Sequence, residues 1–234
     1  EGGANGYGVI YRITTNGVLT SLYSFTNGND GASPASGLLQ TTDGNLYGTT
    51  EEGGANNYGV VFRFATNGVL TPLYSFTDGH DGAYPEGALA QGNDGNLYGT
   101  TYEGGANGYG VIFQIATNGD LASLYSFTDG HDGANPIAGL ALANSGNLFG
   151  TTIGGGTNRY GAVFELSLSA PALNIFSEGD QSVLSWPGWA NNYVLQSTTN
   201  LALPGWTNVT NAMPGTTVTV TNSLPARYFR LVYP

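Results

Sequence analysis

Apolar residues alternate with polar or small residues in short stretches that recur along most of the chain. Every second residue from Tyr7 to Ile13 is apolar, as a half-buried β-strand requires. Thr15-Asn16-Gly17 follows, and residues 19–26 form a second stretch of the same kind. An Asn-Gly pair between two such stretches predicts a β-hairpin with a type I′ turn, in which both central residues have positive φ.

This pattern repeats with a fixed period. Gly-Gly pairs begin at residues 2, 53, 104 and 155, a constant step of 51 residues. Such a period indicates a repeat architecture, in which one unit cannot bury its apolar surface without its neighbours. Each full period predicts four antiparallel strands, for example around Leu89 and at 97–101, 109–116 and 121–128.

The third strand of each unit is apolar on both faces, which predicts sheets covered on both sides. Alternation puts Val60, Phe62 and Phe64 on one face and Val61 on the other. Four-stranded sheets of about 50 residues that stack face to face are β-propeller blades. We therefore predict an all-β fold of propeller-like blades, with a right-handed β-solenoid as the alternative. The aromatic residues expected between the blades are Tyr47, Phe62, Tyr74, Phe76 and their repeat equivalents.

The repeat pattern stops near Leu168, and Ser169-Ala170-Pro171 has the composition of a linker. Short alternating strands separated by Pro, Gly and Asn then predict a small β-sandwich. We therefore expect two domains, a tandem β-repeat array at 1–168 that forms an incomplete ring and a β-sandwich at 169–234.

Two stretches of sequence resemble known families. The motif Asp-Gly-Asn-Leu-Tyr-Gly-Thr-Thr at 94–101, with Gly-Gly-Ala-Asn and Leu-Tyr-Ser-Phe, resembles the GloVer-type tandem repeat of bacterial secreted proteins over residues 1–168. Its Gly-Asn-Leu-Tyr-Gly-Thr core is also similar to the blades of two-component-regulator sensor propellers. This resemblance implies a propeller-like fold, an extracellular or cell-surface location in a bacterium, and no assigned catalytic residues. Residues 182–186, 193–196 and 227–231 are similar to fibronectin-III-like modules.

Charge and cysteine content exclude several classes of function. Sixteen acidic residues face five basic ones, all of them Arg, so the net charge of −11 repels nucleic acids and anionic membranes. The sequence has no Cys, which excludes disulfides, thiol catalysis and zinc-thiolate sites. No apolar run approaches the ~20 residues needed to span a bilayer, so no membrane span is predicted.

Strand alternation places the connections between the second and third strands and between successive units at one end of every sheet. This loop-rich end is where ligand sites are expected, since functional residues concentrate on loops held by a rigid scaffold. The tyrosines beside Gly-Gly-Ala-Asn are candidates for stacking on sugar rings. The candidate ligand-binding residues are Tyr58, Tyr109, Asn56, Asn107, Glu52, Glu103, His80 and His131.

Two acidic loops are candidates for Ca²⁺ binding, which would be the only cofactor. Asp78 and Asp81 in one loop, and Asp129 and Asp132 in the next, offer oxygen ligands at short spacing. The alternative is that these side chains close Asx turns on their own backbone. Adjacent Glu51 and Glu52 point to opposite faces of an extended strand, so they make a poor acid–base pair.

Three functions remain open. The repeats number fewer than the ~4–8 blades of closed propellers, so we expect a non-catalytic structural or adhesive protein whose unpaired edge strands join copies of itself into a ring or filament. A lectin-like module for cell-surface or matrix glycans, with or without Ca²⁺, is the alternative. A propeller glycosidase or lyase would require a carboxylate that is unique to one repeat and lies at the axis, and most acidic residues here recur.

Overall fold

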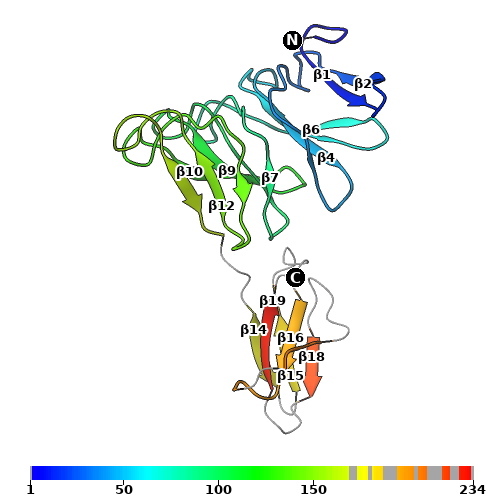
Figure 1. Cartoon of the computed structure of the whole chain (residues 1–234), viewed down its shortest axis with the longest axis vertical. Coiled ribbons are helices and arrows are strands. Elements are labelled where there is room, and N and C mark those ends of the chain that lie inside the picture. Colours follow the sequence, from blue (N-terminus) through cyan, green and yellow to red (C-terminus); the bar gives the residue numbers. More distant parts are fainter. Residues whose placement is uncertain are drawn as a thin grey trace. The chain divides into compact units, whose positions relative to one another are not determined.

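The computed structural model describes residues 2–168, 173–178, 181–186, 194–202, 205–209, 218–221 and 227–232. Over these residues the chain consists of strands and turns, with no helix (Figure 1). None of the described segments is therefore a helix that could cross a membrane. The chain divides into two compact units, one of residues 1–92 and 97–167 and the other of residues 93–96 and 168–234.

The first unit contains four antiparallel sheets in chain order, β1-β2, β3-β4-β5-β6, β7-β8-β9-β10 and β11-β12-β13. We call them sheets one to four. The strands are β1 (Val9–Ile13), β2 (Leu19–Ser24), β3 (Leu39–Gln40), β4 (Leu46–Thr50), β5 (Val60–Phe64), β6 (Leu70–Ser75), β7 (Ala90–Gln91), β8 (Leu97–Thr100), β9 (Val111–Ile115), β10 (Leu121–Ser126), β11 (Ala141–Leu142), β12 (Leu148–Thr151) and β13 (Val163–Leu166).

The predicted all-β fold of four-stranded antiparallel repeat modules is confirmed. Each strand of sheets two and three pairs with the next one along the chain, so the two sheets are four-stranded meanders. Strands β7 to β10 lie on the four stretches predicted from the sequence. Sheet four has only three strands among the described residues.

The tight hairpin turns differ from the predicted type I′ geometry. In the first hairpin only Gly17 has a positive φ, of 87°, and Asn16 does not. The Thr14 N–H donates to Val18 O at 3.0 Å and the Gly17 N–H donates to Thr14 O at 2.9 Å. This is a three-residue loop with a left-handed glycine at its end, which the Asn-Gly pair alone does not distinguish from a two-residue turn.

Aromatic and branched side chains fill the space between successive sheets. Val60, Phe62 and Phe64 of β5 pack toward sheet one with Ile10 and Phe25. Val61 of the same strand belongs to another cluster, which contains Tyr47, Phe76, Phe113 and Ile115 and lies between sheets two and three. The predicted division of the two faces, and the inter-sheet position of the aromatic residues, are confirmed. A sheet of this kind is stable only between neighbours, since both faces are apolar.

The second unit has two three-stranded sheets, β14-β15-β18 and β17-β16-β19. Its strands are β14 (Asn174–Glu178), β15 (Gln181–Ser185), β16 (Val194–Thr198), β17 (Thr207–Asn208), β18 (Val218–Thr221) and β19 (Tyr228–Val232). Leu184 and Val220 of one sheet share a buried cluster with Leu195 of the other, with Phe229 and Leu231 packed against it. Two sheets around one core match the predicted small sandwich, and its fibronectin-III-like character stays a prediction.

Candidate functional site

Backbone hydrogen bonds fasten the two sets of long loops to each other at one end of the repeat sheets. Ala83 and Glu103 form an antiparallel bridge, as do Ala32 with Glu52 and Ala134 with Gly154. The Gly105 N–H donates to Gly79 O at 2.7 Å. The connections between units therefore lie beside the connections between the second and third strands, as strand alternation predicts.

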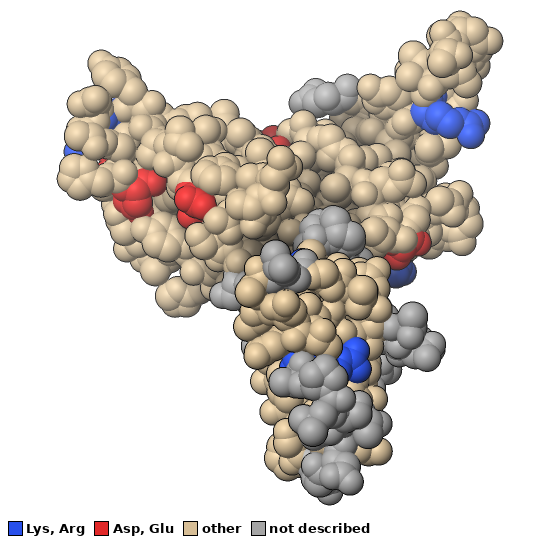
Figure 2. All heavy atoms as spheres, turned by 60° about the horizontal axis from the view of Figure 1, so that its bottom comes forward, with Lys and Arg blue, Asp and Glu red and all other residues tan. Residues whose placement is uncertain are grey.

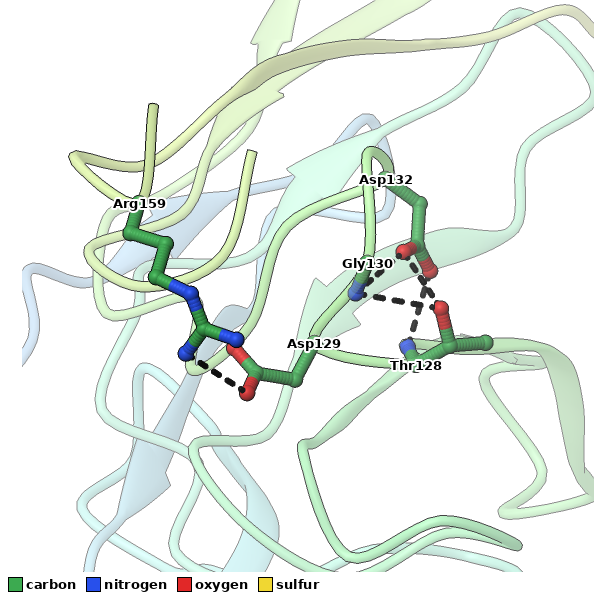
Figure 3. Close-up of polar contacts among 5 residues, drawn as sticks. All are labelled: Thr128, Asp129, Gly130, Asp132 and Arg159. Atoms are coloured by element: carbon green, nitrogen blue, oxygen red, sulfur yellow. Dashed lines mark hydrogen bonds and ion pairs between the residues drawn. The ribbon is translucent and has the colours of Figure 1, made fainter. Parts of the chain in front are cut away.

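One acidic residue in each inter-unit loop organises the turn around it. The Asp132 carboxylate accepts hydrogen bonds from the Thr128 N–H at 2.8 Å, the Thr128 hydroxyl at 2.6 Å and the Gly130 N–H at 3.2 Å (Figure 3). It also accepts one from the Tyr125 hydroxyl at 2.9 Å. Burial raises the pKa of Asp132, but the hydrogen bonds from Thr128 and Tyr125 outweigh it and lower that pKa. Asp132 thus stays ionised and stabilises the loop through these hydrogen bonds.

The carboxylate of Asp129, the second acidic residue of the same loop, takes no part in this turn. The turn around Asp132 recurs at Asp30 and Asp81, with the same types of donor. Asp129 instead points away from Asp132 and lies 4.0 Å from Arg159 (Figure 3). The candidate Ca²⁺ ligands therefore do not converge, and no group of three or more His, Asp or Glu among the described residues could hold a metal ion. Ca²⁺ binding at these loops stays a prediction without a convergent set of ligands.

Several candidate ligand-binding residues hold the loops in place. The amide groups of Asn56 and Asn107 donate to Phe76 O at 3.2 Å and Phe127 O at 3.1 Å, each across 20 residues. His80 and His131 are exposed, and His131 Nδ1 lies 3.3 Å from Thr157 Oγ1. Asn56 and Asn107 are repeat equivalents, as are His80 and His131, so the two members of each pair lie in separate loops.

A tyrosine pair lies where sheets two and three meet at the loop-rich end. The rings of Tyr58 and Tyr84 contact edge to face, with centroids 5.7 Å apart and an interplanar angle of 72°. Burial is the largest cause of the raised pKa of Tyr84. The nearby Tyr58, Glu103, Asp78 and Glu52 raise it further, in that order. The structure thus gathers four of the sequence-predicted candidates around Tyr84.

Tyr84 occupies a backbone position that does not favour a tyrosine. Its φ is +56°, and its repeat equivalents Ser33 and Asn135 have φ of +55°. A bulky residue in this left-handed region is an outlier, whereas Asn is enriched there. Strained residues of this kind cluster at functional sites.

Glu86 adds a carboxyl group to this junction. It is half-buried, and burial raises its pKa first, followed by the negative charges of Glu51 and Glu103. Sheets three and four also approach each other near Glu86, since strands β7 and β11 are in contact and a Cβ at Gly87 would lie 2.6 Å from Ala138 O. The junction site, which we define as Tyr58, Tyr84, Glu51, Glu86 and Glu103, combines an aromatic pair with three carboxyl groups.

The sequence reasoning missed Tyr84 and Glu86, although a signal for both is present. Their repeat equivalents are Ser33 and Asn135, and Ala35 and Ile137, so each is a departure from the repeat. Glu51 is another departure, since Tyr102 and Ile153 occupy its equivalent positions. Glu51 and Glu86 therefore meet one part of the condition set for an enzyme, that a carboxylate is unique to one repeat.

The repeats and the sheets they form define a tandem β-repeat protein of the propeller-like class. The profile of the Gloeobacter/Verrucomicrobia repeat matches residues 1–212, and the chain belongs to this family. The match extends beyond residue 168, where the sequence pattern predicts the end of the repeats. No curated protein matches the chain.

Solved structures that resemble the chain include two gluconolactonases. One, from Xanthomonas campestris, has 14% identity and a TM-score of 0.42, and the match covers 67% of this chain and 56% of that one. The other, the periplasmic gluconolactonase of Pseudomonas aeruginosa, has 15% identity and a TM-score of 0.44, with coverage of 95% and 66%. The chain spans less than two thirds of either structure.

These similarities correct the expected function. The matched structures are enzymes, which contradicts the expectation of a non-catalytic structural or adhesive protein that joins its copies through edge strands. At this identity and TM-score the likeness assigns no activity to the chain. The activity has to be argued from the chain's own residues.

Proposed function

We propose that the junction site belongs to a hydrolase that cleaves a C–O bond in a neutral, polyhydroxylated substrate, such as a sugar lactone or a glycoside. The observation that carries this proposal is Glu86, a half-buried carboxyl group found in one repeat only, whose pKa is raised by burial and by Glu51 and Glu103. A carboxyl group with a raised pKa close to other carboxyl groups is a usual arrangement for acid–base catalysis.

The proposed roles follow from the raised pKa of Glu86, which makes it the proton donor. Glu86 donates its proton to the leaving oxygen as the C–O bond breaks. Glu51 or Glu103 accepts a proton from the water that forms the new bond to carbon. The Tyr58–Tyr84 pair offers an aromatic surface for the apolar face of a sugar ring.

Charge favours a neutral substrate. The chain carries a net charge of −11, and basic side chains are few and scattered on the face shown in Figure 2. An anion is repelled at such a surface, whereas a neutral lactone is not. Hydrolysis of a lactone yields a carboxylate, so the same charge favours release of the product.

The test is an assay of the full chain on a panel of neutral sugar lactones and aryl glycosides. We expect turnover of at least one class and a loss of kcat of about 10²–10⁴-fold in Glu86→Gln, which cannot donate the catalytic proton. Because the raised pKa keeps Glu86 protonated to higher pH, wild-type activity falls as pH rises through that pKa, and the variant lacks this limb.

Asp120→Asn is the matched control, since Asp120 lies in a tight turn at the opposite end of the sheet, where its backbone N–H bonds Asn118. This variant should retain wild-type kcat. Full activity in Glu86→Gln, or no turnover of either substrate class by the wild type, would contradict the proposal.

A further inference from the structure

Strand β13 presents an open edge next to an apolar groove. In the part of the chain that the structure describes, β12 pairs with β13 on one side and no strand lies on the other. The groove has a volume of about 270 Å³. It is lined by Ile112, Leu124, Tyr125, Phe127, His131, Asp132 and residues 163–166.

The preceding repeat shows what fills this place. There β10 pairs with β9, with Leu121 opposite Ile115 and Ala122 opposite Gln114. Leu121 packs against the cluster between sheets two and three, together with Leu73 and Tyr74. The last two residues are the repeat equivalents of Leu124 and Tyr125 in the groove.

We propose that the edge of β13 binds an extended segment of a separate polypeptide, which pairs with β13 as β10 pairs with β9. Addition of a strand to an open sheet edge combines backbone hydrogen bonds with side-chain pockets. By the register of β10, an apolar residue opposite Leu166 enters the groove, and the next residue lies opposite Glu165.

Glu165 indicates the charge of that partner. It lies on β13 opposite Phe149, and its Oε1 accepts a hydrogen bond of 2.6 Å from Asn147. A basic residue opposite a glutamate stabilises a cross-strand pair, whereas an acidic one destabilises it.

The strands that occupy this place in the other repeats do not carry this charge. At the position opposite the equivalent of Glu165, β2 has Thr20, β6 has Thr71 and β10 has Ala122. Strand β2, β6 or β10 of a second copy is therefore a poorer match than a segment with a basic residue there. The occupant we infer is an extended peptide with the pattern Leu-Lys/Arg-x-Leu-Tyr.

The test uses fluorescence polarisation with the full chain and three labelled synthetic peptides. The first is Leu-Lys-Ser-Leu-Tyr-Ser-Phe, the second has Ala in place of Lys, as in residues 121–127, and the third has Glu there. We expect the Lys peptide to bind tightest, with the Ala peptide weaker by roughly twofold to fivefold, as one cross-strand charge pair allows. The Glu peptide should bind weakest.

Two variants at the edge and one matched control locate the effect. Glu165→Gln should remove the preference for Lys, and Glu165→Lys should reverse the order of the three peptides. Gln114→Lys should leave the order unchanged, because β10 already covers that edge of β9. Amide exchange at Val163 and Glu165 should slow when the Lys peptide is bound.

The proposal is overturned if none of the peptides binds or if all three bind equally. It is also overturned if the free chain is a dimer in light scattering and these amides are protected only in the dimer, since a second copy would then occupy the edge. Neither result bears on Glu86, so the hydrolase proposal is judged separately.

Discussion

Strands β9 and β13 occupy the same position in successive repeats, and their sequences are nearly interchangeable. Ile112-Phe113-Gln114-Ile115 in the first corresponds to Val163-Phe164-Glu165-Leu166 in the second. Ile112 is 4% exposed and Phe113 is fully buried, whereas Val163 is 77% exposed and Phe164 is only half-buried.

The difference comes from the neighbours of each strand. Strand β9 lies between β8 and β10 in a sheet whose faces meet sheets two and four, and β13 pairs with β12 alone among the described strands. Apolar residues on both faces are stabilising only where another sheet covers them. The stability of a repeat is therefore set largely by its contacts with the next one.

The largest effect that tests this comparison is loss of the phenylalanine that both strands share. Phe113→Ala should lower the free energy of unfolding by about 3–5 kcal/mol, because it leaves a cavity in the cluster that also holds Phe76. Phe164→Ala should cost about half as much or less, since its ring is partly in solvent already. Chemical denaturation of both variants gives the two values. Equal losses would show that neighbours do not set the stability.

A smaller effect is expected at the loop turns, where the two repeats do not differ. Asp81 and Asp132 accept the same hydrogen bonds, including one from Tyr74 at 3.0 Å and one from Tyr125 at 2.9 Å. Asn at either position offers one acceptor oxygen where the carboxylate offers two. Each Asp→Asn change should therefore cost about 1–2 kcal/mol, and the two costs should agree within about 0.5 kcal/mol. Chemical denaturation of the two variants measures both costs, and a loss at one turn only would contradict their equivalence.

The cost at Asp132 should depend on pH. Its pKa is lowered in the folded chain, so its contribution to stability is present at neutral pH and is lost as pH falls through that folded pKa. The difference in unfolding free energy between wild type and Asp132→Asn should thus shrink in acid. Asp129→Asn is the control, because its ion pair is 4.0 Å long and made with a largely exposed Arg159, so it should contribute little. A difference that grows in acid would contradict this assignment.

The architecture could be predicted from the sequence because it repeats. A 51-residue period, alternation in each strand and apolar residues on both faces of β5 predict stacked four-stranded sheets, as observed. The exposure of β13 could not be predicted from the sequence, since its residues match those of β9. Only the neighbouring strands distinguish the two. The predicted type I′ turn at Asn16-Gly17 was wrong, because the length of the loop depends on which residues close the hairpin. An Asn-Gly pair does not specify those residues.

The candidate site could be predicted only in part, for a related reason. Tyr58, Glu52 and Glu103 were found because they recur, and recurrence draws attention to residues that maintain the repeat. Asn56 and Asn107 recur for that structural reason, as their hydrogen bonds to backbone carbonyl groups show. Tyr84 and Glu86 differ from their repeat equivalents, and departures from a repeat are the better guide to residues outside its structural needs.

The smallest effect in the comparison is expected at Val163 of β13, whose repeat equivalent is Val61 of β5, two repeats earlier. Val61 is fully buried in the cluster between sheets two and three, whereas Val163 is 77% exposed. Val61→Thr should lower the free energy of unfolding by about 1–2 kcal/mol, because it buries a hydroxyl group. Val163→Thr should change it by less than about 0.5 kcal/mol, as at other exposed positions. Denaturation midpoints of the two variants measure an identical chemical change in two environments. A loss at Val163 as large as that at Val61 would mean that β13 is covered in solution, and repetition of the measurement with the Lys peptide present would show whether a bound strand supplies that cover.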